Sequence, residues 1–144
     1  DVATASPTYS RQLGLILVGE DNAGVRDVIC HVLRSRGHDV IPVSDGRDVI
    51  EAIDRHAGRL ALLLLDIDLP SVTGPECLAH ARTRSAVIPC LLTSGGAMPT
   101  LPADLGLHTR FLAKPFAMDD LLDAVDALLA ECPPPKADHA ATRD

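Results

Sequence analysis

Residues 62–70 of this 144-residue chain read Leu-Leu-Leu-Leu-Asp-Ile-Asp-Leu-Pro. Four consecutive leucines that end at a turn are typical of a strand buried on both faces in the middle of a parallel sheet. A carboxylate, Asp66, follows the last leucine directly. Ligands of open parallel sheets bind outside the carboxyl ends of the strands, so Asp66 is a candidate functional residue. An isolated aspartate at such a position often only begins a turn, and the rest of the chain has to decide between the two roles.

The composition favours one domain with an aliphatic core. A chain of this length buries about 70% of its unfolded surface, and only 2% of the residues are aromatic, so aliphatic side chains must fill the interior. The net charge of -7 argues against a broad surface for nucleic acid or for anionic membranes. Because no apolar run reaches the length of a membrane span, about 18 residues, and no signal-peptide pattern is present, we expect a cytoplasmic protein without membrane contact.

The four cysteines are far apart and fall within apolar periodic segments. This pattern predicts buried, reduced thiols rather than disulfides or zinc ligands. The cysteines are Cys30, Cys77, Cys90 and Cys132.

Apolar runs alternate with helical patterns along the chain. We expect strands at residues 14–19, 39–43, 60–66, 87–93 and 110–113. We expect helices at about 22–37, 45–58, 75–84 and 118–132, and at most one or two turns at 102–107. Residues 1–12 are interpreted as a flexible tail, 13–132 as the folded domain, and 133–144 as a Pro-rich disordered tail.

This alternation predicts an α/β fold in which helices cover both faces of a five-stranded parallel sheet. Pro42 cannot donate a hydrogen bond within a sheet, so its strand belongs at an edge. The strand order 2-1-3-4-5 of a doubly wound, flavodoxin-like domain satisfies this condition. The glycines and prolines of residues 95–109 predict that the fourth helix is short or irregular.

Acidic side chains follow two of the expected strands at the point where each ends. Glu20 and Asp21 come directly after the first run, and Asp66 ends the third. The order 2-1-3-4-5 sets these two ends side by side, so the three carboxylates are expected to converge. They repel one another unless a cation is present, and Mg²⁺ prefers such hard oxygen ligands. We predict Asp21 and Asp66 as direct ligands, with Glu20 bound directly or through water. The backbone carbonyl of Asp68 completes the predicted set.

Thr93 and Lys114 end the fourth and fifth expected strands, and thus lie on the same rim. A hydroxyl, an ammonium and a metal can neutralise and orient a phosphoryl group, with Asp66 as the nucleophile that forms an aspartyl-phosphate. Each residue taken alone is more often a turn residue, a helix start or a solvated lysine. Their joint placement at the ends of successive strands favours the functional interpretation.

With these residues in place, the chain resembles the receiver domain of two-component response regulators over about residues 13–131. The motifs are short, but their order and spacing are specific. The residues that carry the resemblance are Glu20-Asp21 after ILVG, Asp66 after LLLL with Pro70 and Gly74 downstream, Thr93 after PCLL, and Lys114-Pro115-Phe116 after Phe111.

The resemblance implies a phosphorelay in which Asp66 accepts a phosphoryl group from a phosphohistidine while the acidic pair binds Mg²⁺. It implies that Lys114 contacts the phosphoryl group and that Thr93 does so in the active form. It further implies a cis Lys114-Pro115 peptide, and a switch aromatic at Phe111 that turns inward as the threonine moves. On the residues alone, Phe111 is a core phenylalanine on its strand, and both roles can hold together.

The same resemblance implies a signalling domain that promotes its own phosphorylation and dephosphorylation, not a conventional enzyme. Its partner would be a sensor histidine kinase or a phosphotransfer domain, since none of the six histidines, among them His31, stands beside a candidate nucleophile. The parent could be a single-domain regulator, a longer regulator or a hybrid histidine kinase, and a homodimer is left open. Asp68 and Gly95 occupy positions that tune phosphoryl lifetime in the family. The irregular segment 95–109 departs from the family's usual output surface.

Two alternatives stay open at this stage. Asp66-Ile67-Asp68, Thr93-Ser94 and Lys114 also resemble the motifs of haloacid-dehalogenase-type phosphatases. That family needs a further acidic motif after the lysine, and it leaves Glu20-Asp21 unexplained. The other alternative is a receiver-like module that binds partners without phosphorylation.

Overall fold

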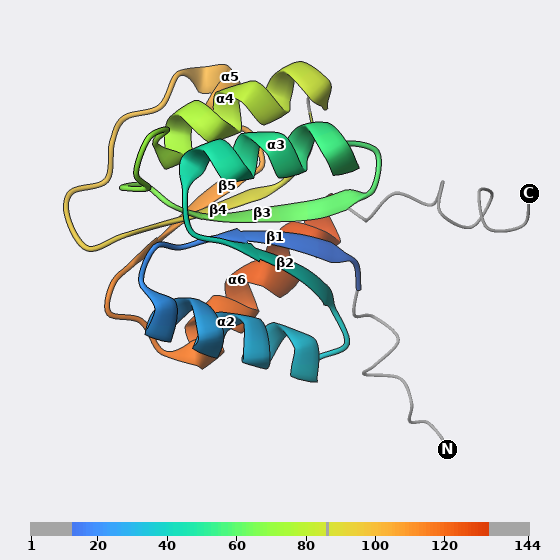
Figure 1. Ribbon diagram of the computed structural model, residues 1–144, viewed down its shortest axis with the longest axis vertical. Helices are drawn as coiled ribbons and strands as arrows, with labels where there is room; N and C mark the ends of the chain where they lie inside the picture. Colours follow the sequence, from blue (N-terminus) through green and yellow to red (C-terminus); the bar gives the residue numbers. More distant parts are fainter. Residues whose placement is uncertain (1–12, 86, 133–144) are drawn as a thin grey trace, which may run out of the picture.

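A computed structural model describes residues 13–85 and 87–132, and shows a parallel sheet between two layers of helices (Figure 1). The strand order is β2-β1-β3-β4-β5, which confirms the predicted topology. The tails expected at residues 1–12 and 133–144 lie outside the described residues. In chain order the elements are β1 (Leu15–Gly19), α2 (Ala23–Ser35), β2 (Asp39–Val43), α3 (Gly46–His56), β3 (Leu60–Asp66), α4 (Gly74–Arg84), β4 (Cys90–Ser94), α5 (Ala103–Gly106), β5 (Thr109–Ala113) and α6 (Met118–Glu131).

The leucine run forms β3, the central strand, and every residue of this strand is buried. Successive side chains alternate between the faces, as a pleated strand requires. Leu63 and Leu65 belong to the core under α3 and α4, whereas Leu62 and Leu64 belong to the core over α2 and α6. Each fully buried leucine contributes about 1.5–3 kcal/mol, so β3 is held firmly from both faces.

The helices pack with the apolar faces that their periodicity predicts. Figure 1 shows α2 and α6 on one side of the sheet and α3 and α4 on the other. The five large apolar residues that recur at helical spacing in α6 are buried, as are Cys77, Leu78 and Ala81 of α4. The buried residues of α6 are Leu121, Leu122, Val125, Leu128 and Leu129.

Strand β2 lies at one edge of the sheet, as Pro42 predicts. Pro42 pairs in register with Val18 of β1 and is exposed. The main-chain N–H of Glu20 continues this pairing beyond β1, donating to the carbonyl of Val43 at 3.1 Å. The start of the loop that carries Glu20 is thus tied to the edge strand.

Several local predictions were wrong. β4 begins at Cys90 rather than Val87, and Val87 is 57% exposed. Pro89 faces β3, where its carbonyl accepts from the N–H of Leu63 at 3.0 Å but it has no N–H to donate, so regular pairing of β4 starts at Cys90, whose N–H reaches the carbonyl of His108 at 3.0 Å. The helical spacing of Val28 with Val25 and Val32 predicts a place on the inner face of α2, but Val28 is 48% exposed. Cys132 is only partly buried, whereas the other three thiols are buried, and all four are free.

The fourth helix of the fold, α5, has only four residues, which confirms the prediction of a short helix. None of its residues is buried, and its N-terminus has no side-chain cap within the described part of the chain. Leu101 and Leu105 pack partly against the core on the α3 and α4 side. Within residues 13–85 and 87–132, no helix is both long enough and apolar enough to cross a bilayer.

Candidate functional site

Three acidic side chains converge where β1 and β3 end. One carboxylate oxygen from each of Glu20, Asp21 and Asp66 lies within 4.8 Å of the others. Glu20 and Asp66 are 1% and 5% exposed, whereas Asp21 is exposed to solvent. The convergence follows from the parallel pairing of β1 with β3, in which Gly19 lies opposite Leu65. The predicted acidic cluster is therefore present in the structure.

Lys114 connects two of these carboxylates. Its Nζ donates to Oδ2 of Asp66 and to Oε1 of Glu20, each at 2.8 Å. Partial burial of the ammonium lowers its pKa, but the hydrogen bonds to Asp66 and Glu20 more than offset this effect, so the pKa of Lys114 is raised. The lysine therefore holds a positive charge at neutral pH, directly against the candidate nucleophile.

The backbone at the end of β5 places this lysine. Ala113 pairs with Ser94 of β4, and the next N–H, that of Lys114, donates to the Ser94 carbonyl at 2.8 Å. The Lys114-Pro115 peptide bond is cis, the conformation that the family resemblance implies. Lys114 is thus carried on an extension of the sheet rather than on a free loop.

Thr93 lies beside the nucleophile on the neighbouring strand. It pairs with Asp66 in the β3–β4 register, and its carbonyl accepts from the N–H of Ile67 at 2.8 Å. The Thr93 side chain is buried, and its Oγ1 has no hydrogen-bond partner among residues 13–85 and 87–132. A buried hydroxyl without a partner is costly, which is consistent with a site prepared for a polar ligand.

The loop after Asp66 fixes the carboxylate and passes close to α4. Oδ1 of Asp66 accepts from the N–H of Asp68 at 2.9 Å. A Cβ added at Gly74, the first residue of α4, would lie 2.6 Å from the Asp66 carbonyl oxygen, so only glycine permits this approach. The Asp68 side chain is exposed and is not part of the acidic cluster. A role for the Asp68 carbonyl in metal binding stays a prediction.

Two further contacts hold Glu20, and sequence reasoning did not find them. Oε2 of Glu20 accepts from the N–H of Asn22 at 3.0 Å, and the Glu20 carbonyl accepts from Nη1 of Arg26 at 2.8 Å. Asn22 is also the N-cap of α2, accepting from the N–H of Val25. Nothing in the residue pattern distinguishes Arg26 from Arg34, the other arginine of α2, so no signal for its role was available.

A third feature was missed although its signal is present in the sequence. Thr73 and Glu76 form a capping box at the start of α4, in which each side chain accepts from the other's main-chain N–H. The pattern Thr-x-x-Glu before an apolar helix is the known signature of this motif. The capping box fixes the helix end that abuts the Asp66 loop.

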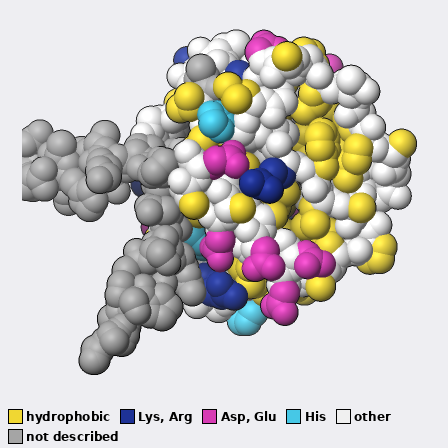
Figure 2. Space-filling view, turned by 180° about the vertical axis from the view of Figure 1, so that it is seen from behind, with side chains coloured by type: hydrophobic (Ala, Val, Ile, Leu, Met, Phe, Trp, Pro, Cys, Tyr) yellow, Lys and Arg dark blue, Asp and Glu magenta, His cyan; other side chains and the backbone are white. Residues whose placement is uncertain are grey.

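Phe111 lies one residue from the position opposite Thr93, and its side chain is 39% exposed. The expected core position of Phe111 is therefore wrong in this conformation, whereas its role as a switch stays a prediction. Seen from behind, the molecule carries hydrophobic side chains gathered along one side (Figure 2). Phe111 and Leu107 are both among the exposed large hydrophobic residues.

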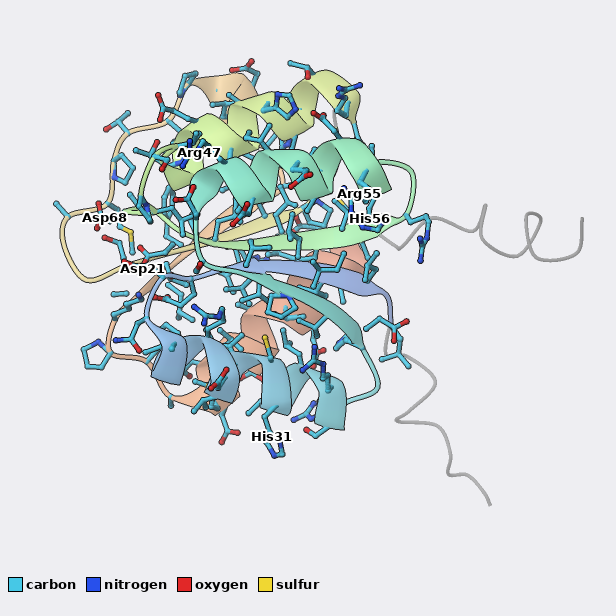
Figure 3. The ribbon with its side chains drawn as sticks, in the orientation of Figure 1. Asp21, His31, Arg47, Arg55, His56 and Asp68 are labelled. Carbon is cyan, nitrogen blue, oxygen red and sulfur yellow. The ribbon has the colours of Figure 1, made fainter. Side chains whose placement is uncertain are left out.

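Asp21 and Asp68 lie at the same end of the sheet, while His31 points away on the outer side of α2 and His56 lies at the opposite end (Figure 3). Neither of these histidines can reach the acidic cluster.

The residues fit a hard divalent cation. Three carboxylates supply the oxygen donors that Mg²⁺ prefers, and their atoms are close enough to share one ion. The single ammonium of Lys114 offsets only part of their charge. The donor set therefore agrees with the predicted magnesium site.

Comparison with known proteins gives the family. Residues 16–126 match the response regulator receiver domain. The chain belongs to the response regulator receiver family. The transcriptional regulatory protein TcrA of Mycobacterium tuberculosis is 35% identical over 123 residues, which cover 84% of this chain and 48% of TcrA. The sensor kinase CckA of Brucella abortus is 28% identical over 116 residues, which cover 79% of this chain and 12% of that kinase.

The solved structures agree with this receiver assignment. The receiver domain of a hybrid histidine kinase CckA superposes with a TM-score of 0.71 and 31% identity, covering 81% of this chain and 99% of that one. Receiver domains take phosphoryl groups from histidine kinases or phosphotransfer proteins. The present receiver domain spans about half of TcrA, whose remaining half has no counterpart among the matched residues. The family assignment gives no support to the phosphatase alternative.

Proposed function

We propose that Asp66 is the phosphoacceptor of this receiver domain, and that phosphorylation switches the binding of a signalling partner. The observation that carries the proposal is the position of Lys114, whose Nζ donates at 2.8 Å to both Asp66 and Glu20 within the acidic cluster. A nucleophilic carboxylate, a fixed cation and a buried hydroxyl on the neighbouring strand are the groups that phosphoryl transfer requires.

The transfer step uses Asp66 as an oxygen nucleophile. One carboxylate oxygen bonds to the phosphorus of a phosphohistidine while the P–N bond breaks, and the electron pair of that bond stays on the imidazole nitrogen. The product is an acyl phosphate, whose later hydrolysis by water regenerates the carboxylate. Lys114 is positioned to neutralise a phosphoryl oxygen, and the Thr93 hydroxyl can donate to another.

We further propose that Glu20, Asp21 and Asp66 hold Mg²⁺, with the Asp68 carbonyl as a fourth protein ligand. When bound, the ion neutralises negative charge on the carboxylates and on the transferring group. The chain's own residues prepare this arrangement, because Asn22 and Arg26 fix Glu20 from the side of α2. The N–H of Asp68 fixes Asp66 from the other side.

The donor is proposed to be a sensor kinase or a phosphotransfer domain, in the cytoplasm where ATP is available to such kinases. An apolar hollow of about 600 Å³ adjoins the site, between the first turns of α2 and the segment from Lys114 to Met118. Because Asn22 and Lys114 belong both to the hollow and to the rim of the site, a donor that presents its phosphohistidine to Asp66 covers it. Val28→Asp would place a charge in this hollow. The variant is expected to take the phosphoryl group from a phosphorylated kinase more slowly, which is measured as slower loss of labelled phosphate from the kinase.

The phosphoacceptor proposal is tested with a small-molecule phosphodonor, acetyl phosphate, and intact-mass measurement. The wild-type chain is expected to gain one phosphoryl group in the presence of Mg²⁺, and Asp66→Asn is expected to gain none. Absence of any gain in the wild type would sink the proposal. Repeated turnover of phosphomonoesters would instead favour a phosphatase. The full gene sequence decides whether the parent protein is a transcriptional regulator or a hybrid kinase. The mass of the phosphorylated form in solution decides whether it is a homodimer.

A further inference from the structure

Arg82, on α4, contacts the chain connecting β4 to β5 at two points and the first residue of β5 at a third. Its Nη1 donates to the Asp104 carbonyl at 3.1 Å, and its Nη2 donates to the Leu107 carbonyl at 2.6 Å and to Oγ1 of Thr109 at 3.2 Å. The arginine is partly buried, and this burial lowers the pKa of its guanidinium. None of these contacts belongs to the phosphoacceptor site.

Besides Arg82, the segment is held by partly buried side chains, by the main-chain hydrogen bond from Cys90 to His108, and by the contact of His108 Nδ1 with Glu131 at 3.4 Å. The helix α5 lacks both a buried residue and a side-chain N-cap among the described residues, and a helix of one turn is marginal by itself. Leu101 and Leu105 are only partly buried against the core. The Thr109 hydroxyl, which accepts from Arg82, donates in turn to the Leu105 carbonyl at 2.7 Å. One side chain on α4 therefore makes three hydrogen bonds to α5 and the residues after it, where a longer helix would have a packed face.

The connection leads away from the site at one end and returns to it at the other. It begins directly after Thr93 and Ser94, and it ends at β5, which carries Phe111 and delivers Lys114 to Asp66. The segment that directly follows Thr93 and Ser94 is therefore also bonded to α4 near its far end. The left-handed backbone of His108, with φ of 58°, lies at this fixed end and is uncommon for a residue other than glycine.

We propose that Arg82 is a positioning residue that holds the 95–108 connection in the phosphoryl-free conformation and thereby opposes switching. The inference rests on the proposed function of Asp66. Phosphorylation gives the buried Thr93 hydroxyl an acceptor, and the shift of Thr93 toward it strains the connection against the Arg82 contacts. Contacts that exist in one of two conformations bias the equilibrium toward that conformation, so their loss favours the phosphorylated form.

The test compares Arg82→Gln with Arg84→Gln in the full chain. Arg84 is on the same helix and pairs with Asp54 instead of the connection, so it is a matched control. Hydrogen exchange of the 97–110 amides is measured without phosphodonor, and the initial rate of phosphorylation is measured with acetyl phosphate and Mg²⁺. For Arg82→Gln we expect faster exchange in this segment alone, and phosphorylation faster by about three- to tenfold. Arg82→Lys, which keeps the charge and some donors, is expected to fall between Arg82→Gln and the wild type.

Unchanged hydrogen exchange of the 97–110 amides in Arg82→Gln would overturn the proposal. Faster exchange with an unchanged or slower phosphorylation rate would show that Arg82 has only a structural role. If Arg82→Gln also speeds the hydrogen exchange of the β3 amides, the fold itself is loosened, and Thr109→Val is used in place of Arg82→Gln. Thr109→Val removes only the hydroxyl that Arg82 and Leu105 share. The valine variant must then show the same two effects in smaller measure, and their absence would likewise overturn the proposal. A wild-type chain that is never phosphorylated would refute the proposed function of Asp66. Hydrogen exchange measured without phosphodonor would still show whether Arg82 holds the 95–108 connection.

Discussion

The Lys114 ammonium lies 2.8 Å from an oxygen of Asp66, across 48 positions of the sequence. The same nitrogen reaches Glu20 across 94 positions, again at 2.8 Å. One cation therefore joins the ends of three strands, β1, β3 and β5, and offsets part of the repulsion between buried carboxylates. Lys114 thus has two roles in the proposed mechanism, to stabilise the resting site and to meet the incoming phosphoryl group.

Lys114→Met is expected to destabilise the metal-free protein by about 1.5–3 kcal/mol at neutral pH, the range for hydrogen bonds to charged groups. The pKa of Lys114 is raised in the folded state, so its contribution is fully present below the unfolded value of about 10.4 and is lost as the pH rises through the folded pKa. Denaturant unfolding of both proteins, from neutral pH to above this value, measures the difference. A difference that grows with alkaline pH would contradict the assigned ion pairs.

Mg²⁺ is expected to raise the unfolding free energy of the wild type, by about 2.7 kcal/mol at a concentration one hundred times its dissociation constant. Asp21→Asn removes one of the three clustered carboxylates and should weaken this effect strongly. Asp27→Asn is the matched control, because Asp27 is an exposed acid on α2 outside the cluster. Equal responses of the two variants to Mg²⁺ would show that the cluster is not the binding site.

Gly74→Ala is expected to destabilise the fold by about 1–3 kcal/mol, because the new Cβ would lie 2.6 Å from the Asp66 carbonyl oxygen. The forced shift should also slow phosphorylation by acetyl phosphate, since it moves the backbone of the acceptor. Gly58→Ala serves as the control, because a Cβ at that position has nothing within 4 Å. If both alanines leave stability and phosphorylation unchanged, the close packing of α4 on the Asp66 loop is not important for the site.

Thr73→Ala is expected to cost about 1 kcal/mol through loss of the α4 N-cap. The pKa of Glu76 in the same capping box is lowered, chiefly by the main-chain N–H of Thr73. Its contribution is therefore present above the usual glutamate value of about 4.3 and is lost as the pH falls through the lowered pKa. Thr73→Ala keeps this main-chain N–H, so Glu76→Ala carries the pH test, and thermal unfolding from neutral to acidic pH should show Glu76→Ala and the wild type converging in acid. Thr83→Ala, near the other end of α4, should produce no such convergence.

The sequence predicted the sheet and the convergence of the site well, because both depend on features that few alternatives share. A fully apolar run such as Leu62–Leu65 has few places in a fold other than a covered central strand. Pro42 excludes its own strand from the interior of the sheet. Once the strand order is known, parallel pairing brings Glu20, Asp21 and Asp66 to one edge without further assumptions.

What the sequence could not predict depends on tertiary contacts between residues of common type. Arg26 and Arg82 are ordinary helical arginines by sequence, and only their surroundings direct them to backbone carbonyls. Val28 fits the helical period of α2 as well as its buried neighbours do, yet it is 48% exposed and lines the hollow between α2 and the segment from Lys114 to Met118. The start of β4 was misplaced because Val87 and Ile88 have strand-forming side chains, whereas pairing depends on the N–H that Pro89 lacks.

The central claim is that Asp66 itself carries the phosphoryl group. Borohydride reduces an aspartyl-phosphate to homoserine, so the protein is phosphorylated by acetyl phosphate with Mg²⁺, reduced, digested and sequenced by mass spectrometry. We predict homoserine at position 66 in the wild type and in Asp68→Asn, and at no position in Asp66→Asn. Homoserine at position 68 or 21 of the wild type, or a phosphorylated wild type without homoserine at position 66, would contradict the account.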